Sequence, residues 1–176
     1  MKASAGFTLV ELMVVIVIAS ILMAIGVPSY RSVTNSNRVS AEVNALLGDL
    51  QFARSEAIKE GLSVTACPMK ADATACSGLT TWHKGWIVIG NDGTGPVVLR
   101  VQQPFANAKD SFVSDNNVTA IAFNREGFAA PQPALAAGAA TIKLTTLPNT
   151  AQWMRCVEVT VGGSLTTERY GQGSCQ

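Results

Sequence analysis

The sequence predicts an α+β protein in which a long N-terminal helix packs against antiparallel β-sheet. Apolar residues follow helical spacing up to Gly61, and beyond this glycine their period switches to two, as in strands. Strands that all follow one leading helix are typical of the α+β class, with the sheet covering half of the helix. The helix has two halves, because an apolar stretch precedes an amphipathic one.

The apolar stretch, residues 7–28, is long enough to cross a membrane. From Phe7 to Val27, Glu11 is the only ionisable side chain. A transmembrane helix needs about 20 apolar residues to cross a hydrocarbon core of about 30 Å. A carboxylate inside such a helix costs about 2.5–3.5 kcal/mol and therefore points to a function. Glu11 lies near the start of the stretch, so a position at the polar interface, at little cost, is the alternative.

A short leader precedes this stretch. Residues 1–6 carry one positive charge, Lys2, and end in the small residue Gly6. A secretory signal is cut after its apolar region, whereas the candidate junction Gly6–Phe7 lies before it. Cleavage there would leave the helix on the mature protein with a new ammonium group on Phe7. Glu11 of a neighbouring copy would be a natural partner for this charge, because buried charges are penalised unless they are paired.

The amphipathic half of the helix, residues 29–61, carries one apolar stripe. Its spacing places the stripe on a single face, which is expected to pack on the following domain. Gly61 is expected to end the helix in the left-handed conformation, and Gly26 with Pro28 to bend it. The stripe consists of Val39, Val43, Leu46, Leu47, Leu50, Ala53, Ala57 and Ile58.

Strand patterns follow, separated by turns. A polar loop is expected at residues 68–80, turns at 90–93 and 125–127, and a loose segment rich in Ala, Pro and Gly at 129–140. The expected strands alternate apolar and polar residues or form short apolar runs. They span residues 62–67, 86–89, 97–101, 118–123, 141–146, 154–161 and 165–170.

The four cysteines lie outside the apolar stretch: Cys67, Cys76, Cys156 and Cys175. An even number on an exported domain indicates two disulfides in an oxidising compartment. Three connectivities are possible, and Cys67–Cys76 with Cys156–Cys175 is favoured because each pair closes a short loop rich in turn residues. A metal site is not expected, since no CxxC is present and His83 is the only histidine.

The sequence shows none of the groupings that enzymes use. Catalysis needs a nucleophile beside a base, paired carboxylates or a metal, and His83 is expected to be a solvated loop residue. The glycine-rich turn at residues 90–95 is not followed by the GK[ST] of a phosphate loop. We therefore expect a protein that is not an enzyme and has no cofactor. Its net charge of +1 also argues against nucleic-acid binding as a default.

The N-terminal residues carry a family resemblance. Gly6-Phe7-Thr8-Leu9-Val10-Glu11, followed by an apolar helix with Pro28, resembles the class III signal of type IV prepilins and type II secretion pseudopilins. The resemblance implies cleavage after Gly6 by a prepilin peptidase and N-methylation of Phe7. It also implies filament assembly through Phe7, Glu11 and Pro28, with Glu11 docking the subunit into a helical filament.

The domain extends this resemblance to the GspH/FimT family of minor pilins and pseudopilins. The family fold implied is a long helix packed on a β-sandwich of two small sheets. The function implied is that of a minor type IV pilin that primes assembly near the filament tip and serves twitching motility and adhesion. A type II secretion pseudopilin is the alternative. The matching segments are ARSEAI at 53–58, Cys67-Pro68, GWIV at 85–88, Leu99-Arg100, FNREG at 123–127 and Cys175.

DNA binding is a second alternative, because some members of this family are competence pilins that catch DNA. In those proteins the resemblance points to a Gly-Arg-x-Arg motif in the C-terminal hairpin. The matching residues 162–169 lack both arginines of the motif, and only Arg169 lies nearby. Without clustered cations, little counterion release would drive binding to phosphates. Arg169 is therefore expected to be an ordinary strand residue, and DNA is kept only as an alternative partner.

These inferences divide the chain into four parts. They are a leader at 1–6, a transmembrane and assembly helix at 7–28, an amphipathic helix half at 29–61 and a β-rich periplasmic domain at 62–176. The expected location is the bacterial inner membrane, followed by an extracellular pilus or a periplasmic pseudopilus. The expected partners are the prepilin peptidase, other minor pilins and the major pilin. Contacts with the other pilins are expected through the N-terminal helices.

Overall fold

The structure is a computed structural model of the whole chain, and it describes residues 8–132, 139–147 and 151–176. The chain divides into two compact units, residues 1–38 and 39–176.

One long helix, α1 (Leu9–Glu60), begins in the first unit and ends in the second. Pro28 lies inside this helix, which continues past it. The helix stops where the sequence predicts, because Gly61 takes the left-handed conformation with φ of 68°. Within the second unit, the buried side chains of α1 are Val39, Val43, Leu46, Leu50, Ala53 and Ala57. They belong to the predicted apolar stripe.

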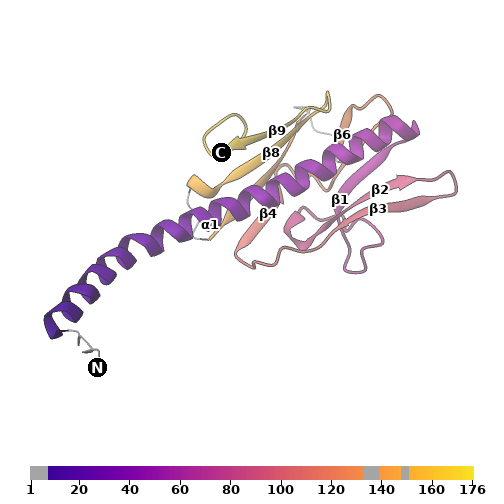
Figure 1. Cartoon of the computed structure of the whole chain (residues 1–176). Helices are drawn as coiled ribbons and strands as arrows, with labels where there is room; N and C mark the ends of the chain where they lie inside the picture. Colours follow the sequence, from indigo (N-terminus) through magenta and orange to yellow (C-terminus); the bar gives the residue numbers. More distant parts are fainter. Residues whose placement is uncertain (1–7, 133–138, 148–150) are drawn as a thin grey trace. The chain divides into compact units, whose positions relative to one another are not determined.

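The rest of the second unit is antiparallel sheet (Figure 1). One sheet has five strands in the order β3-β2-β1-β5-β6, and the other has four in the order β4-β7-β8-β9. The fold class expected from the sequence is confirmed. The strands are β1 (Val64–Pro68), β2 (Trp86–Asn91), β3 (Pro96–Gln102), β4 (Asp110–Ser114), β5 (Ala120–Phe123), β6 (Ala129–Gln132), β7 (Ala139–Thr146), β8 (Arg155–Thr160) and β9 (Leu165–Arg169). Two short 3-10 helices, η1 (Trp82–Lys84) and η2 (Ala151–Trp153), precede β2 and β8.

One apolar core joins the second half of α1 to both sheets. Leu46 and Leu50 of the helix, Trp86 and Val88 of the first sheet and Val157 of the second are all fully buried in it. Burying a side chain of this size contributes about 1.5–3 kcal/mol. The helix half therefore owes its place to this packing, since helical propensity alone stabilises a helix only weakly.

Two strands were not expected from the sequence. Strand β4 was missed because its inward-facing residues include Asp110 and Ser114, which are only 4% and 5% exposed, so the apolar alternation is masked. Strand β6 lies in the segment predicted to be loose. Its Pro131 lacks a backbone N–H, and the strand forms because it is at the edge of its sheet. Residues 133–138 of the predicted loose segment lie outside the described residues.

Arg54 of α1 ties the ends of the two sheets together. Its Nε donates to the carbonyl oxygen of Gly127, 3.0 Å away, in the turn between β5 and β6. The backbone N–H of Ala129 then donates to the carbonyl oxygen of Val161, after β8, at 2.8 Å. Gly163 passes so close to Gly127 that an added Cβ would lie 2.1 Å from its carbonyl oxygen. This junction accordingly needs a glycine at position 163.

Asp49 links α1 to the first sheet. Its Oδ2 accepts a 2.9 Å hydrogen bond from the indole N–H of Trp86, and its Oδ1 lies 3.0 Å from Arg100 Nη1. The Arg100 guanidinium also stacks on the Phe52 ring, 3.8 Å from its centroid. One carboxylate thus satisfies a fully buried donor and orients an arginine at the sheet edge.

Replacing Asp49 by Ala is expected to lower the free energy of unfolding by about 1–3 kcal/mol, because the buried Trp86 N–H would lose its acceptor. Denaturant unfolding of the full chain in detergent micelles, followed by tryptophan fluorescence, measures this change. The matched control is Glu126→Ala, which removes only an exposed ion pair with Arg125 and should leave the unfolding midpoint unchanged. Equal losses in the two variants would contradict the role given to Asp49.

Candidate functional site

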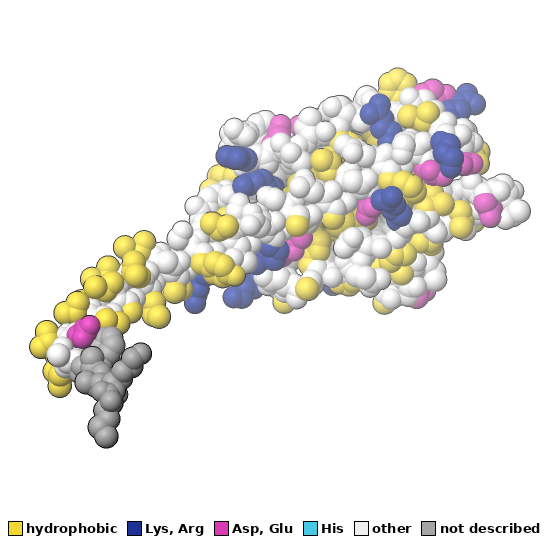
Figure 2. Space-filling view, viewed as in Figure 1, with side chains coloured by type: hydrophobic (Ala, Val, Ile, Leu, Met, Phe, Trp, Pro, Cys, Tyr) yellow, Lys and Arg dark blue, Asp and Glu magenta, His cyan; other side chains and the backbone are white. Residues whose placement is uncertain are grey.

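The first candidate site is the apolar surface of the first unit (Figure 2). Every large apolar side chain between Leu9 and Val27 is at least 49% exposed. An 18-residue window of α1 has a mean hydropathy of 2.7, and none of it is buried among the described residues. By length and composition this part of α1 could cross a membrane. A helix that is apolar on all sides and uncovered needs another apolar environment, either lipid or other helices.

Glu11 lies in the first turn of this helix, next to its cap. The Thr8 hydroxyl oxygen accepts a 3.2 Å hydrogen bond from the Glu11 backbone N–H. A carboxylate at this end is favoured by the helix dipole. The capping role of Thr8 was missed in the sequence, although its signal is the Thr-x-x-Glu spacing of a capping box. Gly6 and Phe7, the predicted cleavage and methylation residues, lie outside the described residues.

Both disulfides of the second unit join neighbouring parts of the chain. Cys67 bonds to Cys76, and Cys156 bonds to Cys175. The first staples the loop that follows β1, and the second fastens the C-terminal segment to β8. Cys67, Cys156 and Cys175 are fully buried. Loops closed in this way typically gain about 2–4 kcal/mol of stability.

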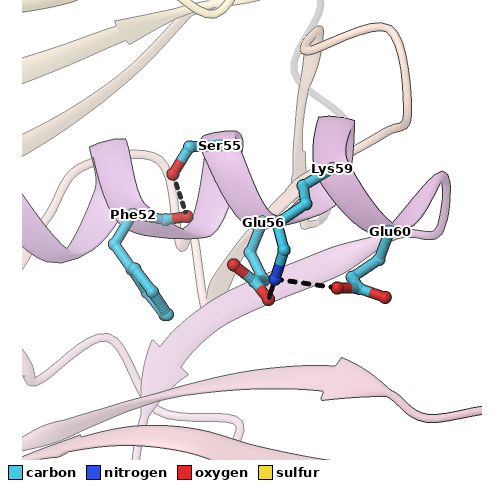
Figure 3. Close-up of polar contacts among 5 residues, drawn as sticks. All are labelled: Phe52, Ser55, Glu56, Lys59 and Glu60. Carbon is cyan, nitrogen blue, oxygen red and sulfur yellow. Dashed lines mark hydrogen bonds and ion pairs between the residues drawn. The ribbon is translucent and has the colours of Figure 1, made fainter.

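A charged group occupies the last turns of α1 (Figure 3). Lys59 Nζ lies 3.0 Å from a carboxylate oxygen of Glu56 and 3.0 Å from one of Glu60. Hydrogen bonds to these two carboxylates, with the larger effect from Glu60, and their negative charges raise the pKa of Lys59. The carboxylates of Glu56 and Glu60 line a small cavity of about 220 Å³ beside the β2–β3 turn. The other polar side chains of its lining are Asn91 and Asp92, and no His, Cys or Ser of the described residues lines it.

His83 is held more firmly than expected. It lies on η1 and is half-buried, not a solvated loop residue. Its Nδ1 accepts a 3.2 Å hydrogen bond from the backbone N–H of Phe112 in β4. The ring therefore links η1 to β4. Within the described ranges, no three His, Cys, Asp or Glu side chains are grouped closely enough to hold a metal ion.

Arg169, the candidate cation of the C-terminal hairpin, is the last residue of strand β9, so it is a strand residue as expected. It is directly opposite Arg155 in the β8–β9 register. The two arginines line a cavity of about 330 Å³ together with Ala151, Gln152 and Tyr170. Sequence reasoning missed Arg155, because the residue opposite Arg169 is defined only by the strand register.

Two family models match the chain. One, described as type II transport protein GspH, matches residues 42–163. The other, described as a prokaryotic N-terminal methylation motif, matches residues 1–27. Together they cover the apolar helix and most of the sheet domain.

Curated proteins and solved structures are also similar to this chain. Two Pseudomonas aeruginosa proteins named fimbrial protein are each 38% identical over 80 residues, which is 46% of this chain and 51% of theirs. The chain thus matches about half the length of these relatives. The type IV minor pilin FimU of P. aeruginosa has a TM-score of 0.56 at 20% identity, covering 79% of this chain and 92% of FimU. The minor pseudopilin EpsH of Vibrio cholerae has a TM-score of 0.53 at 10% identity, covering 77% and 99%. These two likenesses show a shared fold.

Replacing Val15 and Ile18 together by arginine is expected to release the chain from membranes. Each charge at the centre of a membrane helix costs about 2.5–3.5 kcal/mol. The measurement is the share of full-length protein that stays with alkali-washed membranes, where the wild type should be retained. Asn37→Arg, at an exposed helical position beyond the apolar stretch, should also be retained. A double variant held as firmly as the wild type would show that the stretch does not span the membrane.

Proposed function

We propose that this chain, which belongs to the GspH family of type II transport proteins, is a minor pilin of a type IV pilus. The observation that carries the proposal is the apolar half of α1, whose large side chains are all exposed, whereas the other half buries one apolar face in the domain core. Such a helix is suited to storage in a membrane and then to packing among the helices of other subunits. The domain would give this subunit a surface of its own.

The N-terminal residues would prepare the helix for assembly. A prepilin peptidase would cut after Gly6, and Phe7 would become the methylated N-terminus. The match of the N-terminal methylation motif to residues 1–27 supports this step. The chain would wait in the inner membrane with its domain in the periplasm. The two disulfides are consistent with that oxidising compartment.

Glu11 would set the register of the subunit in the filament. Once the leader is removed, the Phe7 ammonium group of a neighbouring subunit is a partner of opposite charge for this carboxylate. Apolar helix packing would supply most of the assembly energy, while the ion pair would select one axial position. Pro28 would mark where the assembly helix passes into the domain-bearing half. Other minor pilins and the major pilin would be its partners, and a place at or near the filament tip fits a subunit that primes assembly.

A minor pseudopilin of a type II secretion system is the second candidate. The family description names type II transport, and EpsH shares the fold. The relatives named fimbrial protein, at 38% identity, favour the pilus. A pseudopilin would stay in the periplasm and serve protein export, whereas a pilin would reach the cell surface and serve motility or adhesion.

Replacing Glu11 by Ala is expected to reduce incorporation of this subunit into surface filaments at least tenfold, because the Phe7 ammonium of a neighbour would be left unpaired in an apolar setting. The measurement is the amount of this chain in sheared filaments, relative to the amount in the membrane fraction. The control is Glu60→Ala, which removes a carboxylate at the far end of α1 and should be incorporated normally.

Incorporation of the Glu11→Ala protein at the wild-type level would contradict the docking role. Glu11 would then be a carboxylate tolerated at the polar interface. Intact variant protein must be found in the membrane fraction, so that failed synthesis is not mistaken for failed assembly.

A further inference from the structure

The cavity at the end of β8 and β9 brings two like charges together. Arg155 and Arg169 are direct cross-strand neighbours, an arrangement in which like charges destabilise a sheet. Cβ atoms of such pairs are about 4.5–5.5 Å apart, and both arginines line one cavity, of about 330 Å³. An anion bound between the two arginines would offset their repulsion.

Arg155 is held in place by the backbone. Its Nη1 donates to the carbonyl oxygens of Gln152, at 2.9 Å, and Met154, at 2.7 Å. A guanidinium has five N–H donors, so these two bonds fix its orientation and leave others for a ligand. Partial burial and the nearby Arg169 both lower the pKa of Arg155, as expected where positive charge is in excess.

No Asp or Glu side chain among the described residues neutralises these two charges. Neither arginine has an ion pair with an Asp or Glu in the ranges 8–132, 139–147 and 151–176. The adjacent Glu168 is committed elsewhere, because its carboxylate accepts a 2.9 Å hydrogen bond from the Ser174 backbone N–H. The sequences of 133–138, PALAAG, and 148–150, PNT, contain no acidic residue.

The size of the cationic group favours one carboxylate over a phosphate chain. A planar carboxylate matches the two-pronged geometry of a guanidinium. Binding to a nucleic-acid backbone instead gains from many cations placed along a track. Here the other nearby cation, Lys143, lies 5.9 Å from the Tyr170 ring and bonds to the Gln176 carbonyl oxygen. A compact pair suits a single Asp or Glu side chain.

We propose that Arg155 and Arg169 form a docking site for an acidic side chain of a neighbouring subunit in the filament. This inference rests on the proposed function, because that function supplies the neighbour. The contact would bring together two domains at the β8–β9 end, at a site remote in sequence from Glu11. It would thus help to select which subunit lies beside this one.

Direct binding tests the chemistry of the site. The full chain in detergent micelles is titrated with the peptide acetyl-Gly-Glu-Glu-Gly-amide, and the arginine Nε–H resonances are followed by NMR. The glutamate peptide should bind at least tenfold more tightly than its glutamine analogue. Arg169→Gln should weaken its binding at least tenfold, and Arg169→Lys several-fold. Lys70→Gln, at an exposed loop position, should have no effect. Arg169 is the residue to change because it is exposed, whereas Arg155 anchors η2.

Two outcomes of the titration would overturn the proposal. Equal binding of the glutamine analogue would show that the arginines do not recognise a carboxylate. Tighter, Arg169-dependent binding of a short thymidine oligonucleotide would assign the site to nucleic-acid phosphate instead.

Incorporation in cells tests the docking role apart from the proposed function. Arg169→Glu and Lys70→Glu change the net charge equally, and only the first should reduce the amount of this chain in sheared filaments, at least threefold. Normal incorporation of both variants would overturn the docking site and leave the pilin assignment intact. Absence of the wild-type chain from filaments would overturn both.

Discussion

An uncovered apolar helix is the constraint on which this protein depends. The side chains of Leu9–Val27 cannot remain in water, since exposing apolar area costs roughly 25 cal/mol per Å². None of these large apolar side chains is buried among the described residues. The helix therefore needs an apolar environment outside its own chain. The proposed function provides two such environments. Lipid surrounds the helix before assembly, and the helices of other subunits surround it afterwards.

The domain, unlike this apolar stretch, buries its own apolar side chains in a core. The second half of α1 is held in the domain by a continuous apolar core and by Asp49. The Asp49 carboxylate accepts a hydrogen bond from the indole N–H of Trp86 and orients Arg100. The domain surface can therefore vary without disturbing the helix by which subunits pack. The pair Arg155 and Arg169 is one such surface feature, set at the end of a hairpin that the Cys156–Cys175 disulfide braces.

The sequence predicts the parts that depend on local chemistry. The helix, its end at Gly61, the β2–β3 hairpin and most strands follow from periodicity and turn residues. Strand β4 was not predicted because Asp110 and Ser114 face inward. Strand β6 was not predicted because Ala129 and Pro131 are poor strand formers, which an edge position tolerates. The pairing of Arg155 with Arg169 needs the strand register, which no local pattern contains. The N-terminal motif, by contrast, can be recognised from the sequence because its residues are consecutive, and the methylation-motif model matches residues 1–27.

The most direct test of the central claim is mass spectrometry of filaments sheared from the cell surface. If this chain is a filament subunit, it should be present in smaller amounts than the major subunit, and its N-terminal peptide should begin at a methylated Phe7. Its absence from the filaments, together with an N-terminus at Met1 in the membrane fraction, would contradict a role as a filament subunit. An unprocessed chain that never leaves the membrane would be an anchored domain and not a filament subunit.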